Sequence, residues 1–188
     1  MKRIALLVLA LIIAAPVFAQ KLSKAEKAAQ QKALYETAVK CFDEKDFCII
    51  PSSYIDSEGI DNPITDNAIF ISMEADGKMY LQGATVCGKN GTYVADVTEY
   101  TKELDKKGNL KLRMVINGRM IKGTFKVTMR VNTNEANVIF TPTSGTTRKY
   151  MGPVVPVAVS GYMKRTGALS RAPLVIIRLL GRSTSLFL

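Results

Sequence analysis

Residues 110–141 read LKLRMVINGRMIKGTFKVTMRVNTNEANVIFT, and this stretch decides the fold. Apolar side chains occupy every second position of Leu110–Ile116 and again of Ile121–Val131, the pattern of strands with one buried face. Asn117-Gly118 between them is a favoured two-residue hairpin sequence, because both turn positions require a positive φ. Asn132–Glu135 then forms a second turn. The stretch therefore predicts a three-stranded antiparallel meander.

The two turns also predict which residues lie opposite each other. The turn register and the alternation place the same side chains on the same face, and this agreement is typical of a well-specified fold. The predicted pairs are Met114 with Ile121, Leu112 with Gly123 and Leu110 with Phe125 across the first turn, and Val131 with Ala136, Met129 with Val138 and Val127 with Phe140 across the second.

The polar face of this meander carries cations and no acid. Together with residues of the final strand, these cations form a candidate anion- or ligand-binding surface, which consists of Arg113, Lys122, Lys126, Arg130, Arg148, Lys149 and Tyr150. The alternative is a solvated face whose acids come from the preceding strand. Pairing Thr98–Leu104 with Leu110–Ile116 puts Glu103 opposite Lys111 and Glu99 near Arg113, which favours this alternative. The same pairing turns Lys102 inward and requires it to lie near the sheet edge.

Further alternating segments surround the meander. Strands are expected at 47–50, 68–74, 78–83, 93–104 and 148–159, and loops at Ser52–Asn67 and Cys87–Thr92. Residues 20–45 are expected to hold one helix, Lys24–Phe42, with a capping box at Ser23 and Glu26. The β-rich domain then covers residues 46–159. Seven or eight strands joined mostly by short turns predict a mainly β fold, an antiparallel meander that forms a barrel or a sandwich, with one N-terminal helix.

The first 19 residues have the three parts of an export signal. Lys2-Arg3 is the charged region, Ile4–Ala15 is the apolar core, and Val17-Phe18-Ala19 offers small residues before a cleavage site. The apolar core is too short to span a bilayer. We expect cleavage after Ala19 and an exported mature chain.

The last 29 residues, 160–188, do not continue the β pattern. They carry five basic residues and no acid, and they show no alternation. We expect a basic tail that is disordered or non-native, such as a shifted reading frame would produce. The alternative is a membrane-surface segment, so any membrane association is expected only through this tail.

Composition excludes several function classes. The formal charge is +10, but most of the excess lies in the signal and the tail, and residues 20–159 carry a net charge of only +3. A domain near this charge lacks the field that holds a nucleic-acid backbone, so nucleic acid is not an expected partner. Histidine is absent, which removes histidine-based triads, general bases and zinc sites. No cofactor, metal site or catalytic residue is predicted.

The segment from Phe47 to about Val155 resembles a family of small secreted proteins of Gram-negative bacteria, domain of unknown function 4251. The resemblance rests on an export signal, an Ala/Lys-rich helix and Asp46-Phe47 at the start of the domain. It also rests on the runs Phe125-Lys126-Val127-Thr128-Met129, Ala136-Asn137-Val138 and Arg148-Lys149-Tyr150-Met151-Gly152. The family's central Leu-Pro-Tyr-Phe-Gly-Arg segment is missing, and Leu81–Gly88 stands near its place. The resemblance implies a β-rich fold and a periplasmic or outer-envelope location, and it implies no activity.

Two sets of reactive side chains could carry chemistry. Cys41 and Cys48 are close enough in sequence for a disulfide that would pin the helix to the first strand. Without histidine to activate it, a catalytic cysteine is disfavoured. The loop acids Asp56, Glu58, Asp61 and Asp66 could serve hydrolysis or calcium, although their spacing matches no EF-hand.

The resulting functional prediction is a secreted, non-enzymatic envelope protein, either a structural module or a module that binds an envelope protein or a small ligand through its sheet or loops. One alternative is a barrel that carries a lipid or another apolar ligand. It predicts a cavity between Met73, Met79 and Leu81 on one side and Val127, Met129 and Phe140 on the other. The other alternative is a hydrolase that uses the loop carboxylates.

Overall fold

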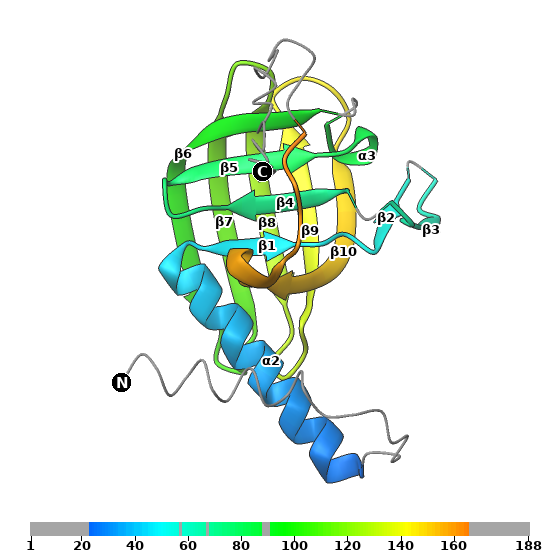
Figure 1. Cartoon of the computed structure of the whole chain (residues 1–188), viewed down its shortest axis with the longest axis vertical. Coiled ribbons are helices and arrows are strands. Elements are labelled where there is room, and N and C mark those ends of the chain that lie inside the picture. The colour runs from blue at the N-terminus through cyan, green and yellow to red at the C-terminus, as the bar shows by residue number, and fades with distance from the viewer. Residues whose placement is uncertain (1–22, 57, 67, 88–90, 166–188) are drawn as a thin grey trace, which may run out of the picture.

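The computed structural model describes residues 23–56, 58–66, 68–87 and 91–165. Ten antiparallel strands form one sheet in the order β1-β4-β5-β6-β7-β8-β9-β10-β2-β3. Strand β1 also pairs with β10, so the sheet closes into an eight-stranded barrel from which β2 and β3 extend (Figure 1). The strands are β1 Phe47–Ile49, β2 Ser53–Ile55, β3 Asp61–Pro63, β4 Phe70–Met73, β5 Lys78–Gln82, β6 Thr92–Leu104, β7 Leu110–Asn117, β8 Lys122–Met129, β9 Glu135–Pro142 and β10 Arg148–Val155.

The predicted fold class is confirmed, and the barrel form is observed. The closing seam is short, since it joins Cys48 to Val155 and Ile49 to Val154. One expected loop, Ser52–Asn67, is wrong in part because it contains β2 and β3, which pair with each other at Tyr54 and Asn62. These strands are three residues each, too short for periodicity to reveal them.

Side chains fill the barrel interior. Phe125 and Phe140 stack there with their ring centroids 4.4 Å apart. The alternation predicted from the sequence puts every second residue of the meander inside, and these residues have at most 2% of their surface exposed: Leu110, Leu112, Met114, Ile116, Phe125, Val127, Met129, Ala136, Val138 and Phe140. The buried apolar surface of this core is the main source of stability.

The two predicted hairpin registers are wrong, although the predicted faces are right. Met114 faces Phe125 rather than Ile121, a shift of four residues. Val127 faces Val138 rather than Phe140, a shift of two. The Asn117-Gly118 pair does not form a two-residue turn, since neither residue has a positive φ. A shift by an even number of residues keeps each side chain on its face of the sheet.

The pairing of β6 with β7 has the predicted register. Glu103 lies opposite Lys111, and Glu99 forms an ion pair with Arg113. Lys102 is turned inward, as expected from this register, with 15% of its side-chain surface exposed. It lies against the helix at the barrel end, where it forms an ion pair with Asp43 and its Nζ is 3.5 Å from the carbonyl oxygen of Val39.

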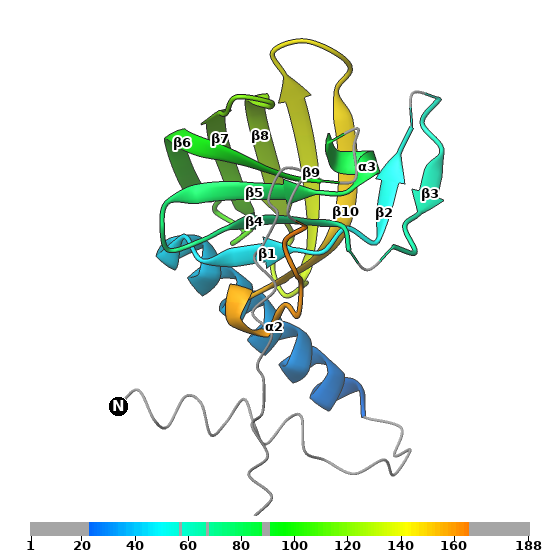
Figure 2. The same ribbon diagram turned by 45° about the horizontal axis from the view of Figure 1, so that its top comes forward.

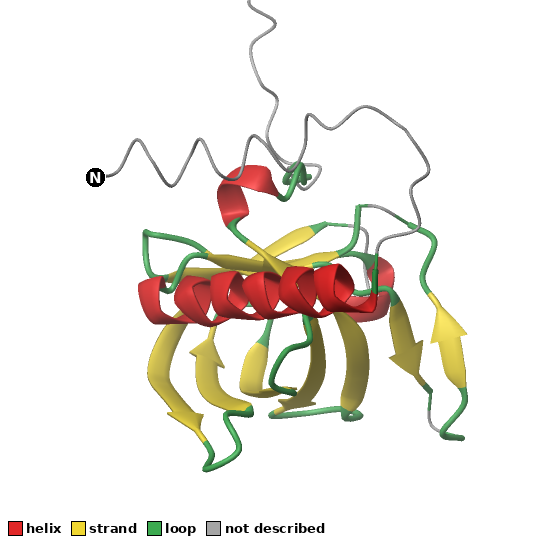
Figure 3. Cartoon of the chain, turned by 90° about the horizontal axis from the view of Figure 1, so that it is seen from below, coloured by secondary structure: helices red, strands yellow, loops and turns green. Residues whose placement is uncertain are grey.

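Helix α2, Lys24–Glu44, lies across one end of the barrel (Figures 2 and 3). It begins with the predicted capping box and ends at Glu44, two residues later than predicted. Lys45, in the left-handed conformation, is its C-cap. Only its C-terminal half is buried, through Tyr35, Ala38, Cys41 and Phe42. The hydroxyl of Tyr100 donates to the carbonyl of Phe42 at 2.5 Å, which ties the helix end to β6.

Two short helical segments follow later in the chain. Helix α3, Ala84–Cys87, lies at the end of the barrel away from α2, and the 3-10 helix η1, Val157–Val159, follows β10. None of the described helices has the length and the apolar content needed to span a bilayer.

Residues 160–165, here named the strap, pack on the outside of β4 and β5 (Figure 1). The ring of Tyr162 stacks on Phe70 at 3.9 Å, and the Nζ of Lys164 is 2.8 Å from a carboxylate oxygen of Glu74. The expectation that the whole of 160–188 lacks structure is therefore wrong for the strap. The rest of the predicted tail and the predicted signal, residues 1–19, lie outside the described residues.

Candidate functional site at the barrel mouth

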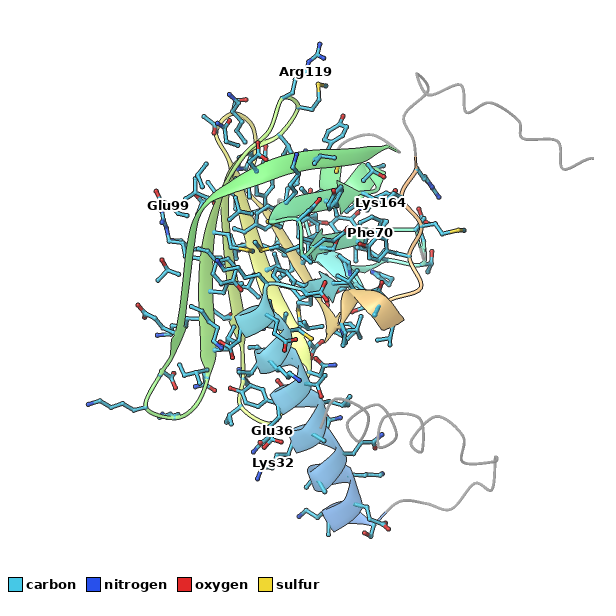
Figure 4. All side chains as sticks on the ribbon, turned by 60° about the vertical axis from the view of Figure 1, so that its left-hand side comes forward. Lys32, Glu36, Phe70, Glu99, Arg119 and Lys164 are labelled. Atoms are coloured by element: carbon cyan, nitrogen blue, oxygen red, sulfur yellow. The ribbon has the colours of Figure 1, made fainter. Side chains whose placement is uncertain are left out.

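The two ends of the barrel differ. Helix α2 lies at one end, and a hollow of about 350 Å³ lies at the other, here named the mouth. The stick view places Arg119 at this end, far from Lys32 and Glu36 of α2 (Figure 4). The mouth is lined by Cys87, Tyr93, Arg119, Met120, Ile121, Lys122, Phe140, Pro142, Thr143, Ser144, Gly145, Thr146 and Arg148.

The β7–β8 loop forms one side of the mouth. The amide of Gly118 donates to the carbonyl of Ile121 at 2.9 Å, so the chain makes a tight four-residue turn. A Cβ at Gly118 would be 2.5 Å from the carbonyl oxygen of Val94, and only glycine allows this close approach to β6. The turn buries Ile121, which is 8% exposed, and leaves Met120 60% exposed.

Three cations line the mouth, and no carboxylate among the described residues does. The guanidinium of Arg148 donates to the carbonyl of Val86 in α3. Arg119 and Lys122 form no ion pair with any described residue. Asp96 lies beside them in the neighbouring surface hollow, and its carboxylate is 3.8 Å from the Nζ of Lys78. The mouth is therefore electropositive, with two charges available to a ligand.

Helix α3 and strand β10 support the wall of the mouth. The hydroxyl of Tyr150 donates to the carbonyl of Thr85 at 3.0 Å, and burial raises the pKa of this phenol to about 12. Burial also raises the pKa of the Cys87 thiol to about 12, although the charge of Arg148 opposes the shift. At neutral pH, Cys87 is thus a protonated, weakly polar part of the wall rather than a nucleophile.

The structure does not bring the seven predicted anion-surface residues together. Lys122 and Arg148 line the mouth, and Tyr150 is buried beside α3. Arg113 and Lys126 face each other outside the barrel, where Glu99 pairs with Arg113. Arg130 is exposed after the end of β8, and Lys149, exposed on the outer face of β10, lines a second surface hollow together with Arg148 and Tyr150.

Sequence reasoning missed Arg119. The predicted turn was Asn117-Gly118 and the predicted strand began at Ile121, so Arg119 had no assigned place, whereas the wider loop places it at the mouth. The sequence does show a cation directly after the Asn117-Gly118 pair. The position of this cation in the structure, however, depends on the length of the loop.

Comparison with solved structures bears on the fold. A crystal structure of a protein of the domain of unknown function 4251 family, from Bacteroides eggerthii, matches with a TM-score of 0.60 and 21% identity. The match covers 69% of this chain and 91% of that protein.

The chain has the fold of domain of unknown function 4251. The resemblance to this family that the sequence indicated is therefore confirmed at the level of the fold. No family model matches the chain, and no curated protein does. Since the name of domain of unknown function 4251 carries no activity, the functional argument depends on the geometry of the site.

The disulfide predicted between Cys41 and Cys48 is not formed, and both residues are free thiols. They face different surroundings on this fold. Cys41 packs in the core between α2 and the barrel, together with Phe42 and Phe47. Cys48 alternates with Phe47 and Ile49, so its side chain points out of the barrel, beneath the strap.

Two of the four loop carboxylates, Asp56 and Asp66, have structural roles. Asp56 accepts hydrogen bonds from the amides of Glu58 and Ile60 and from the side chain of Asn62, and these bonds lower its pKa. Asp66 accepts from the amide of Ala68 at 2.9 Å. Both act as turn residues, as aspartate commonly does. The described residues contain no group of three or more acids, cysteines or histidines that could hold a metal ion.

The cavity that the carrier hypothesis requires is absent from the described part of the barrel. The six side chains that were expected to line it are at most 2% exposed: Met73, Met79, Leu81, Val127, Met129 and Phe140. An internal cavity large enough for a lipid would leave part of the surface of these side chains uncovered, because a water molecule could reach it. The interior is filled, as is usual for eight strands.

Proposed function

We propose that this chain is an exported, non-enzymatic envelope protein that binds a small ligand at the mouth of its barrel. We also propose that it is a divergent member of domain of unknown function 4251. The observation that carries the binding role is the asymmetry of the barrel. One end is closed by α2, the interior is filled, and the other end holds a hollow that combines apolar side chains with two cations, Arg119 and Lys122, that form no ion pair within the described part of the chain.

The export proposal rests on the sequence of residues 1–19. The proposal of a non-enzymatic role rests on three observations. The chain contains no histidine, the Cys87 thiol at the mouth is protonated at neutral pH, and the crowded loop carboxylates Asp56 and Asp66 are bound by neighbouring amides.

A partner protein of the envelope is the second candidate ligand class. The mouth favours a small molecule, because about 350 Å³ lies within the range of small-ligand sites, roughly 300–1,000 Å³. The long outer strands carry alternating charges that pair with each other, such as Glu99 with Arg113 and Lys78 with Asp96, and this is typical of a solvated surface.

The test is a native mass spectrum of the protein isolated from the host envelope, recorded for the natural chain and two variants. Thr143→Trp fills the mouth, while Thr128→Trp places the same bulk on the exposed outer face of β8. We expect a mass that begins at Gln20 with an added small-molecule mass, which is lost in Thr143→Trp and kept in Thr128→Trp.

Each part of the proposal has its own contrary result. A retained Met1 would overturn export. A bare mature mass in the natural chain, or an adduct that survives Thr143→Trp, would overturn ligand binding at the mouth.

A further inference from the structure

We infer that the ligand of the mouth is an amphipathic oxyanion, with one carboxylate or phosphate head and one short apolar arm. This inference rests on the proposed binding function and adds the chemical class of the ligand. The charge, the apolar contact and the size of the hollow each narrow the class of ligand.

The charge of the mouth selects an anionic head. Arg119, in the β7–β8 loop, and Lys122, the first residue of β8, directly flank Met120 and Ile121, and both side chains are exposed. An arginine offers a planar pair of donors that fits an oxyanion, and a lysine adds a point charge. Because no described acid lines the hollow, a cationic ligand has no counter-charge there.

Arg148 is less available to the head than Arg119 or Lys122, since part of its guanidinium already donates to the protein. It donates to the carbonyl of Val86 and is half-buried, so it positions α3 and adds its charge to the field of the mouth. A cation at the C-terminal end of a helix also complements the carbonyls exposed there.

The floor of the mouth selects an apolar arm. Met120, which is 60% exposed, offers the main apolar surface of the hollow, while Ile121 and Phe140, 8% and 1% exposed, add little free surface beside the thiol of Cys87. The lining also contains the hydroxyl groups of Tyr93, Thr143, Ser144 and Thr146, which can hydrogen-bond the oxygens of a head group. Apolar contact at the floor and charge at the rim together match a molecule with one polar end.

The size of the hollow limits the arm. About 350 Å³ is at the lower end of the range for small-ligand sites. It suits a single short chain or ring and excludes the two chains of a whole phospholipid. A free fatty-acid-like carboxylate and a phosphate monoester share the chemistry of the proposed ligand, so the experiment separates them.

The experiment measures binding to the full chain by calorimetry and by the methyl resonances of Met120 and Ile121. Four probes are used: octanoate, octyl phosphate, 1-octanol and inorganic phosphate. Three proteins are compared: the natural chain, Arg119→Gln/Lys122→Gln, and the control Lys126→Gln/Arg130→Gln. The control loses one lysine and one arginine from exposed positions outside the mouth, so its net charge matches that of the test variant.

We expect both octanoate and octyl phosphate to shift the Met120 and Ile121 signals. The anion that binds more tightly identifies the head group of the ligand. Neutralising Arg119 and Lys122 should weaken the binding of that anion by about tenfold or more, since charged hydrogen bonds are lost. The control should keep the natural affinity. Binding should also weaken as salt rises, because exposed charges are screened.

Three results would contradict the inference in distinguishable ways. Equal binding of 1-octanol and octanoate would overturn the anionic head and leave the mouth as a binding site. Equal binding of inorganic phosphate and octyl phosphate would overturn the apolar arm. If no probe moved the Met120 or Ile121 signals, the inference would fail, and an adduct in the native mass spectrum would then show that the proposed function survives with another ligand class.

Discussion

Tyr150 shows how one side chain can hold the candidate site in place. Its ring is 1% exposed, and its hydroxyl donates to the carbonyl of Thr85, while Arg148 on the same face binds the next carbonyl, that of Val86. Strand β10 thus fixes α3, which carries Cys87 into the wall of the mouth. No buried side-chain polar atom among the described residues lacks a hydrogen-bond partner. Each such bond matters, because an unpaired buried group costs free energy.

Tyr150→Phe removes this hydroxyl and keeps the ring. We expect it to lower the free energy of unfolding by about 1 kcal/mol, the usual contribution of a buried hydrogen bond. Chemical denaturation of the natural and variant proteins measures the difference. The matched control is Tyr54→Phe, a half-buried tyrosine of β2, which should change stability by less. Equal losses in the two variants would contradict the anchoring role of Tyr150.

At the scale of single residues, the sequence predicted two of the cations at the mouth, Lys122 and Arg148, but grouped them with residues that lie elsewhere. The alternation of apolar and polar residues showed which side chains of each strand point into the barrel and which point out of it. It could not tell the two ends of the barrel apart, because both ends of a strand share one periodicity. Arg119 became visible only when the length of the β7–β8 loop was known.

At the scale of elements, alternation fixed the face of each residue and left the register open. The predicted hairpins are shifted by four and by two residues, both even numbers. Any even shift keeps Met114, Val127 and Phe140 inside, so burial cannot choose among such registers. The β7–β8 loop therefore determines the register of this hairpin. Burial of Ile121 and the contact of Gly118 with β6 favour a four-residue turn over a two-residue turn. The β6–β7 register was predictable, since charge pairs across the strands distinguish even shifts as well.

The strap is the element that sequence patterns could not reveal. It has no periodicity, and its contacts depend on a sheet face that only the fold creates. On that face Phe70, Ser72 and Cys48 are at most 1% exposed although they point out of the barrel. The hydroxyls of Tyr162 and Ser72 are 3.1 Å apart, and Gln82 donates to the carbonyl of Met163 at 3.1 Å. The strap therefore completes the burial of a second, outer apolar layer.

Removing the strap should expose the thiol of Cys48. Burial raises the pKa of this thiol to about 12, so in the intact chain it is both covered and protonated. In a Cys41→Ala/Cys87→Ala background, we expect a chain that ends at Val159 to react with a disulfide reagent at least about tenfold faster, because exposure restores thiolate character. A chain that ends at Arg165 is the control and should stay protected. Equal rates in the two truncated chains would show that the strap does not cover Cys48.

At the scale of the whole molecule, the sequence predicted a closed or layered antiparallel sheet with one helix, and the barrel fulfils this prediction. It could not choose between barrel and sandwich, because that choice depends on one long-range pairing. Strand β1 has three residues, all buried, so its sequence shows no alternation from which pairing with two neighbouring strands could be predicted. The closing pair joins Cys48 to Val155, which are far apart in the chain, whereas local patterns report only on neighbours.

Gly152 makes this closure sterically possible. A Cβ at this position would be 2.1 Å from the carbonyl oxygen of Ile50, in the chain that leaves β1. We expect Gly152→Ala to lower the free energy of unfolding by about 1–3 kcal/mol, the range for overpacked sites. The control is Gly91→Ala, where a Cβ would meet nothing within 4 Å. Thermal unfolding monitored by circular dichroism compares the two, and a Gly152→Ala protein as stable as the control would contradict the close contact at the seam.

The seam between β1 and β10 also sets the order of events during synthesis. Strand β1 can pair with β10 only after the ribosome has added about a hundred further residues. Such long-range contacts also form slowly. Until then β1 lacks one neighbour and the outer face of β4 lacks its cover. The nascent chain therefore stays open while it is being made. If it is exported as we propose, this delay keeps it in the unfolded form that can be threaded through a membrane, and the barrel closes on the far side.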